Sequence, residues 1–105
     1  MTARNFDELK DFFSGYFHED WVLEAEVPDQ IISSYLACGR SSKDLRELAG
    51  QMLRFADAYS DDVALEQALF SELGCYYLPS VDKISAREWL QHVASILLEA
   101  AERAP

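Results

Sequence analysis

Residues 6–21 read FDELKDFFSGYFHEDW, and this stretch decides how the rest of the chain can fold around it. It holds six aromatic residues, five carboxylates and one histidine. In its first half, Phe6, Leu9 and Phe13 recur at the spacing of one helix face, with carboxylates mostly on the other side. This pattern predicts a first helix over about residues 6–15.

Both ends of this helix carry local signals. Asn5 is the expected N-cap residue, with Glu8 three residues later as its capping-box partner. Carboxylates in a first turn also suit the positive end of the helix dipole. Gly15 is expected to end or distort the helix.

The second half of the stretch runs into residues 18–27, HEDWVLEAEV, which form either an extended connector or a short helical turn. The pattern leaves both open. Trp21 and Leu23 are expected to point inward. The acidic residues of the segment are expected to point outward: Glu19, Asp20, Glu24 and Glu26.

Apolar stripes predict more helices further along the chain. Pro28 suits the first turn of a second helix, and Gly39 is a C-terminal stop. Ser41 or Ser42 caps a third helix that should run to about residue 59.

The last third of the chain repeats this pattern. Ser60-Asp61 should restart a helix, lined by Val63, Leu65, Leu69, Phe70 and Leu73 and closed by Gly74. A loop follows over residues 75–84. Ser85 and Glu88 form a capping box for a final helix that should end near Arg103.

No alternating strand pattern of useful length interrupts these helices. The fold class is therefore all-α, a compact bundle of four to five helices. At 105 residues, the chain is expected to form one helical domain over residues 1–105. A chain of this size buries roughly two-thirds of its unfolded surface, enough for one core.

The net charge is −10 and is unevenly distributed. Residues 1–30 hold eight carboxylates against two basic residues, residues 31–60 three against four, and residues 61–105 eight against three. A field of this sign repels phosphate backbones, so direct nucleic-acid binding is not expected. It would attract a basic protein and speed the encounter. Alternatively, the acidity only keeps a small protein in solution.

The sequence also indicates where in the cell the protein is found. Apolar runs are far shorter than the roughly 20 residues needed to cross a bilayer, and the N-terminus lacks a signal-peptide pattern. We therefore expect a cytoplasmic protein with no membrane partner. Cys38 and Cys75 are expected to be reduced and buried, with a bridge or a functional thiol as the alternatives.

His18, Glu19 and Asp20 are the one cluster that suggests metal binding or acid–base catalysis. Consecutive side chains splay apart on a helix or a strand, so they seldom converge on one ion. His92 is expected to be a half-buried residue that packs between helices. No zinc, phosphate-loop or nucleophile-elbow motif is present, so no cofactor, metal or catalytic residue is expected.

The run FFSGYFH at residues 12–18, followed by an acidic pair and Trp21, resembles the N-terminal signature of a known family. These are the helical CdiI-type immunity proteins of bacterial contact-dependent growth inhibition and related polymorphic toxin systems. Leu73-Gly74, Tyr77, Pro79 and Trp89-Leu90 resemble its second half. The chain departs from the pattern at Glu19, where the family favours an amide.

This resemblance implies a protein that is not an enzyme and that binds a toxin. The partner would be the basic C-terminal toxin domain of a CdiA-like effector, in many such systems a nuclease. The alternatives are a small acidic regulator that mimics nucleic-acid charge and, further off, a small helical enzyme or metal protein. The candidate toxin-binding residues are Asp7, Glu8, Asp11, Tyr16, Glu19, Asp20, Trp21, Glu24, Glu26, Asp61 and Asp62.

Overall fold

A computed structural model of the chain describes residues 6–104. Its α-helices are α1 (Asp7–Tyr16), α2 (Pro28–Leu36), α3 (Ser42–Asp57), α4 (Asp62–Ser71) and α5 (Ala86–Arg103), with 3₁₀ turns η1 (Trp21–Leu23) and η2 (Pro79–Asp82). No strand occurs in this part of the chain, which confirms the all-α prediction. None of its helices is long and apolar enough to cross a membrane.

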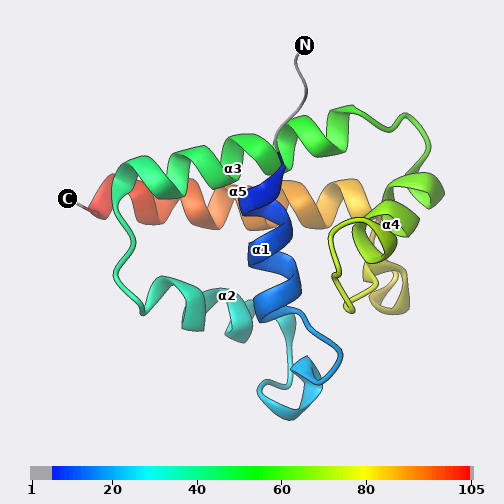
Figure 1. Cartoon of the computed structure of the whole chain (residues 1–105), viewed down its shortest axis with the longest axis horizontal. Helices are drawn as coiled ribbons and strands as arrows, with labels where there is room; N and C mark the ends of the chain where they lie inside the picture. Colours follow the sequence, from blue (N-terminus) through cyan, green and yellow to red (C-terminus); the bar gives the residue numbers. More distant parts are fainter. Residues whose placement is uncertain (1–5, 105) are drawn as a thin grey trace.

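Helices α3 and α5 run antiparallel and form the long axis of the bundle (Figure 1). Helix α1 crosses this pair and contacts α3, while α2 and α4 each pack against α5. The connector between α1 and α2 projects from one edge of the molecule, as the light-blue loop of Figure 1 shows. The chain thus leaves the acidic segment after α1 at the periphery.

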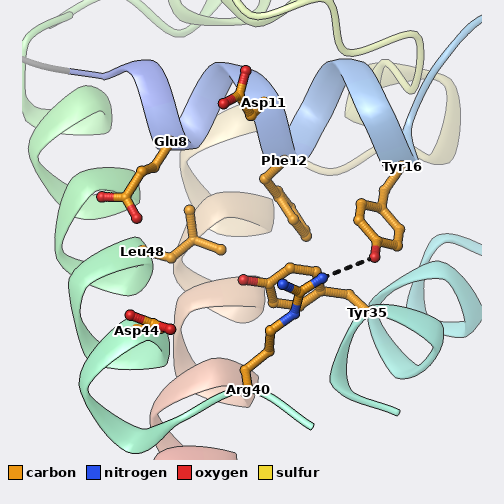
Figure 2. A pocket seen from close by; sticks show the side chains of 8 residues that line it. All are labelled: Glu8, Asp11, Phe12, Tyr16, Tyr35, Arg40, Asp44 and Leu48. Carbon is orange, nitrogen blue, oxygen red and sulfur yellow. Dashed lines mark hydrogen bonds between the residues drawn. The ribbon is translucent and has the colours of Figure 1, made fainter. Parts of the chain in front are cut away.

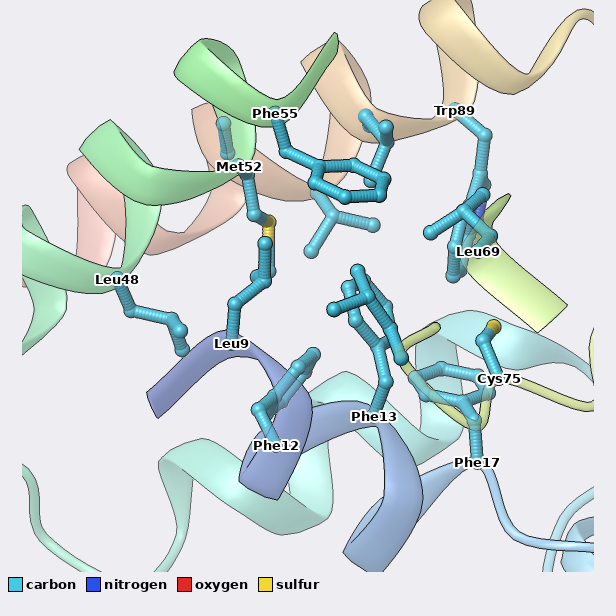
Figure 3. Close-up of a cluster of buried hydrophobic side chains, with 14 of the residues drawn as sticks. Leu9, Phe12, Phe13, Phe17, Leu48, Met52, Phe55, Leu69, Cys75 and Trp89 are labelled. Atoms are coloured by element: carbon cyan, nitrogen blue, oxygen red, sulfur yellow. The ribbon is translucent and has the colours of Figure 1, made fainter. Parts of the chain in front are cut away.

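The apolar face of α1 is the centre of the core, as Figure 3 shows. Leu9, Phe13 and Phe17 have no exposed surface. The ring of Trp89, from α5, lies 5.8 Å from that of Phe13 and 5.4 Å from that of Phe17. Each such side chain contributes about 1.5–3 kcal/mol by leaving water. Phe13, Phe17 and Trp89 therefore form the centre of the core.

The local signals at the ends of α2 and at the starts of α3 and α5 are also confirmed, whereas α1 continues through Gly15 to Tyr16. Ser41 accepts a hydrogen bond from the Asp44 backbone N–H at 3.1 Å, and Ser85 and Glu88 form a complete capping box. Gly39 ends the turn after α2 with φ +76°. The first helix begins at Asp7 without a side-chain cap, and the expected N-cap Asn5 lies outside the described residues.

Gly74 closes the turn after α4 and also lets two segments touch. Its φ is +71°, and a Cβ added there would lie 3.1 Å from the Cβ of Ser14 on α1. A side chain at residue 74 would therefore be strained and would push α1 away from this loop.

Two predictions about the apolar residues are wrong. Leu23 is 80% exposed, because the segment forms the 3₁₀ turn η1 and residues two apart do not share a side there. Val63 and Phe70 are 64% and 45% exposed. Helix α4 lies at the end of the bundle and buries only a narrow stripe, so these two residues face outward.

The two cysteines have different environments, and both are free. Cys75 is fully buried and donates a hydrogen bond from its thiol to the Tyr77 carbonyl at 3.3 Å. Cys38 is exposed, so the expectation of two buried thiols is wrong at this position. Helix α2 ends at Leu36, which leaves Cys38 in the turn beyond the packed face.

This difference predicts one reactive thiol. Burial raises the pKa of the Cys75 thiol to about 12, and the thiolate is the nucleophile, so Cys75 should not react at pH 8. With a thiol-specific chromogenic reagent, we expect one equivalent per folded chain and two in denaturant. Cys38→Ser should abolish the folded-state reaction. Two rapid equivalents in the folded protein would contradict this burial of Cys75.

Candidate functional site

The connector after α1 carries an exposed patch that combines apolar and acidic side chains. Val22 and Leu23 are 62% and 80% exposed, and Val27 is exposed beside them in sequence. The carboxylates of the segment are exposed too. We call this patch the connector surface and define it as Glu19, Asp20, Val22, Leu23, Glu24, Glu26 and Val27.

His18 holds the connector in its turn. The Asp20 backbone N–H donates to Nδ1 of His18 at 3.1 Å, and Nε2 lies 2.8 Å from Oε2 of Glu24. Because Nδ1 accepts, Nε2 carries the ring proton and donates to the carboxylate. The prediction of a hydrogen-bonded His18 with solvated Glu19 and Asp20 is confirmed.

Trp21 packs against the core and so anchors the connector to it. It is 8% exposed, and its ring centroid lies 5.9 Å from that of Phe17 and 5.6 Å from that of Tyr77. Trp21 is one of the candidate toxin-binding residues, but its side chain supports the connector surface and offers little contact area of its own.

A second candidate site is a pocket between α1, the end of α2 and α3, with a volume of about 290 Å³ (Figure 2). We call it the acidic pocket. It brings together three of the predicted residues, Glu8, Asp11 and Tyr16, with Asp44 of α3. The other lining residues are Phe12, Tyr35, Arg40 and Leu48.

Arg40 occupies one side of the acidic pocket. Its Nη2 donates to the Tyr16 hydroxyl at 3.1 Å, and its guanidinium carbon lies 4.3 Å from the centre of the Tyr35 ring. Its Nε is buried and makes no hydrogen bond. Burial raises the pKa of the Tyr35 phenol, and the positive charge of Arg40 offsets part of that rise.

Several other predicted residues serve the fold. Asp62 accepts hydrogen bonds from the Ala86 and Arg87 backbone N–H groups at 2.9 and 3.0 Å, which satisfies the first turn of α5. Asp61 caps α4 through the Ala64 N–H at 3.2 Å. Asp61 and Asp62 were candidate toxin-binding residues. In the structure, both carboxylates accept hydrogen bonds from N–H groups at helix starts.

Glu8 also has a structural partner. The buried Gln51 of α3 donates to Oε1 of Glu8 at 3.1 Å and accepts from the Leu9 N–H at 3.2 Å. Gln51 thus satisfies a donor in the first turn of α1 from a neighbouring helix. Asp7 is exposed on the same first turn, and Glu26 is exposed on the connector.

The histidine of α5 departs from its prediction. His92 is exposed rather than packed between helices, and its Nε2 lies 3.1 Å from both carboxylate oxygens of Asp29 on α2. It therefore bridges α5 and α2 at the surface. Within residues 6–104, no three His, Cys, Asp or Glu side chains are grouped so that they could hold a metal ion.

Sequence reasoning missed two parts of the site. It placed Leu23 inside, and it did not single out Tyr35, Arg40 or Asp44. No local pattern links these residues to α1, since their meeting depends on how α1 crosses α3. The density of acidic residues around 7–26 was the one usable signal, and it indicates the half of the chain that contains α1 and the connector surface.

One comparison with known proteins gives a match. The family model described as CdiI immunity protein matches residues 5–97, most of the chain. Comparison with curated proteins and with solved structures gives no match.

The capping role of Asp62 predicts a stability effect. Asp62→Ala should lower the free energy of unfolding by about 1–2 kcal/mol, because two N–H groups at the start of α5 lose their acceptor. Urea unfolding followed by circular dichroism measures this. Glu99→Ala, at an exposed position of α5, is the control and should change stability by less than about 0.5 kcal/mol. Equal stabilities would refute the capping role.

Proposed function

The chain belongs to the CdiI immunity protein family, and we propose that it binds the C-terminal toxin domain of a CdiA-like effector and blocks it stoichiometrically. We propose further that this domain is a basic nuclease and that the two meet in the cytoplasm. The family assignment favours a toxin partner over a free acidic regulator. The observation that carries the binding role is the connector surface.

The connector surface offers exposed apolar area to a partner within a ring of acidic residues. Two large apolar residues, Val22 and Leu23, are exposed on a turn surrounded by carboxylates. Exposed apolar area contributes to affinity when a partner removes it from water, and the charged rim contributes to specificity. A patch of this kind fits a partner that is basic at its rim and apolar at its centre.

The support beneath the patch strengthens this proposal. Trp21 is buried against Phe17 and Tyr77, and His18 is hydrogen-bonded to Glu24, and these contacts favour the observed turn before binding. Ordering a mobile loop on binding would cost about 0.5–1.5 kcal/mol for each immobilised side chain. A preformed turn avoids most of that cost.

Charge accounts for the proposed blocking step. The chain carries −10, and the connector surface contributes four carboxylates to it. A nuclease cleft is basic because it binds phosphates. An acidic protein is attracted to such a cleft or to its edge, and once bound it excludes the nucleic acid by occupancy and by like charge.

The proposal is tested by co-expression with the toxin domain encoded next to this chain. We expect the chain to restore growth and to co-purify with that domain in a one-to-one complex. A catalytically inactive toxin serves as the control for expression and should allow growth without the chain. An active toxin with neither rescue nor complex would remove this partner, and the acidic-regulator alternative would then lead.

The connector surface predicts a specific loss of binding. Reversing Glu19, Asp20 and Glu26 to Lys should slow association with the toxin at least tenfold at low salt, because electrostatic steering is lost. The difference between the association rates of the variant and of wild type should become smaller as salt rises, because salt screens the charges that steer wild type. Glu24 is left intact because it holds His18. Stopped-flow kinetics measures the rates.

The matched control reverses Glu47, Glu99 and Glu102, which are exposed on α3 and α5 and give the same net charge. It should slow association far less. Equal slowing by both variants would mean that net charge alone acts and that the connector surface has no special role.

A further inference from the structure

The acidic pocket is a second binding feature, separate from the connector surface. We propose that it receives one cationic side chain of the toxin, an arginine, between Glu8 of α1 and Asp44 of α3. This inference rests on the proposed function, because it assumes a basic toxin domain as the partner. It adds to that function the place where one basic residue is held.

The carboxylates of the pocket are free to bind a cation. The ion pairs found within residues 6–104 are His18–Glu24, Arg87–Asp57 and His92–Asp29, and none of them involves a pocket residue. The carboxylates of Asp11 and Asp44 have no hydrogen-bond partner in this part of the chain. Glu8 accepts a single bond, from Gln51.

Arg40 does not neutralise these carboxylates, although it lies in the same pocket. Its guanidinium is hydrogen-bonded to Tyr16 and stacked over Tyr35, on the side of the pocket formed by the two tyrosines. Figure 2 shows Glu8 and Asp44 on either side of Leu48, on the other side of the pocket. Three carboxylates against one guanidinium leave the pocket negative, which excludes an anion and favours a second cation.

The dimensions of the pocket select a side chain as the occupant. Its volume of about 290 Å³ lies at the lower limit of the roughly 300–1,000 Å³ typical of small-molecule sites. Its walls combine an aliphatic side chain, Leu48, with the rings of Phe12 and Tyr35, whose centroids lie 4.8 Å apart. Apolar walls suit the methylene stem of a long basic residue, and the carboxylates suit its charged end.

Arginine fits this pocket better than lysine. A guanidinium is planar, presents several donors at once and stacks on aromatic rings, whereas an ammonium is a compact and strongly hydrated charge. The guanidinium carbon of Arg40 lies 4.3 Å from the centre of the Tyr35 ring, so one ring of the pocket already stacks with a guanidinium. A second guanidinium in the pocket could form paired hydrogen bonds with one of these carboxylates.

The pocket is formed in part by the helix that precedes the connector. Glu8, Asp11, Phe12 and Tyr16 line it from α1, and the connector begins directly after Tyr16. A single partner domain that lies along α1 could therefore reach the pocket and the connector surface together.

The test compares two variants that remove the same two charges. The pocket variant combines Glu8→Gln with Asp44→Asn and so removes two of the pocket's negative charges. The amide oxygen introduced at residue 8 can still accept the hydrogen bond from Gln51. Glu99→Gln with Glu102→Gln removes two exposed charges from α5. Calorimetric titration with the toxin domain encoded next to this chain should show at least tenfold weaker binding for the pocket variant and less than twofold for the control.

Replacing each toxin arginine in turn, in both backgrounds, then identifies the occupant. Replacing the arginine that enters the pocket should weaken binding to wild type but not to the pocket variant. In the pocket variant, the interaction that this arginine makes is already lost.

The outcomes separate the two proposals. If wild type binds the toxin and the pocket variant binds as tightly as the control, the pocket inference is wrong and the proposed function stands. If wild type does not bind, the proposed function fails for this toxin, and the pocket inference fails with it. Circular dichroism with thermal unfolding confirms that each variant is folded.

Discussion

The structure depends on the packing of aromatic rings around Trp89. Phe13, Phe17 and Tyr77 place their ring centroids 5.8, 5.4 and 4.8 Å from that of Trp89, so α1, the loop after α4 and α5 meet at one point. Aromatic pairs of this kind contribute about 0.5–1.5 kcal/mol each beyond the apolar area that they bury. A backbone hydrogen bond from the Tyr76 N–H to the Phe17 carbonyl, at 2.8 Å, joins the loop after α4 to the end of α1.

This cluster also determines what the acidic segment can present. Phe17 and Trp21 are drawn into the core, and the turn between Trp21 and Leu23 then directs Leu23 to solvent. The apolar residues of one short stretch are thereby divided between core and surface. A surface held from beneath by buried rings is suited to bind a partner without first becoming ordered.

The acidic charge of the chain has two uses in the structure. Asp61, Asp62 and Glu88 accept hydrogen bonds at helix starts, where a carboxylate also favours the helix dipole. The carboxylates of the connector surface and of the acidic pocket are mostly unengaged by such bonds, apart from Glu24 with His18 and Glu8 with Gln51. Net charge therefore overstates the charge that is available to a partner, and its location matters more than its sum.

The helices follow from local sequence signals, because helix periodicity and caps depend on residues within one or two turns. Ser41, Gly39 and the Ser85–Glu88 box act as expected for that reason. The exposure of Leu23 and Cys38, the hydrogen bonds from the start of α5 to Asp62, and the shared pocket of Glu8 and Asp44 follow from tertiary packing. Each of these depends on where one element lies against another, and that placement follows from how the aromatic side chains fill the core rather than from any local pattern.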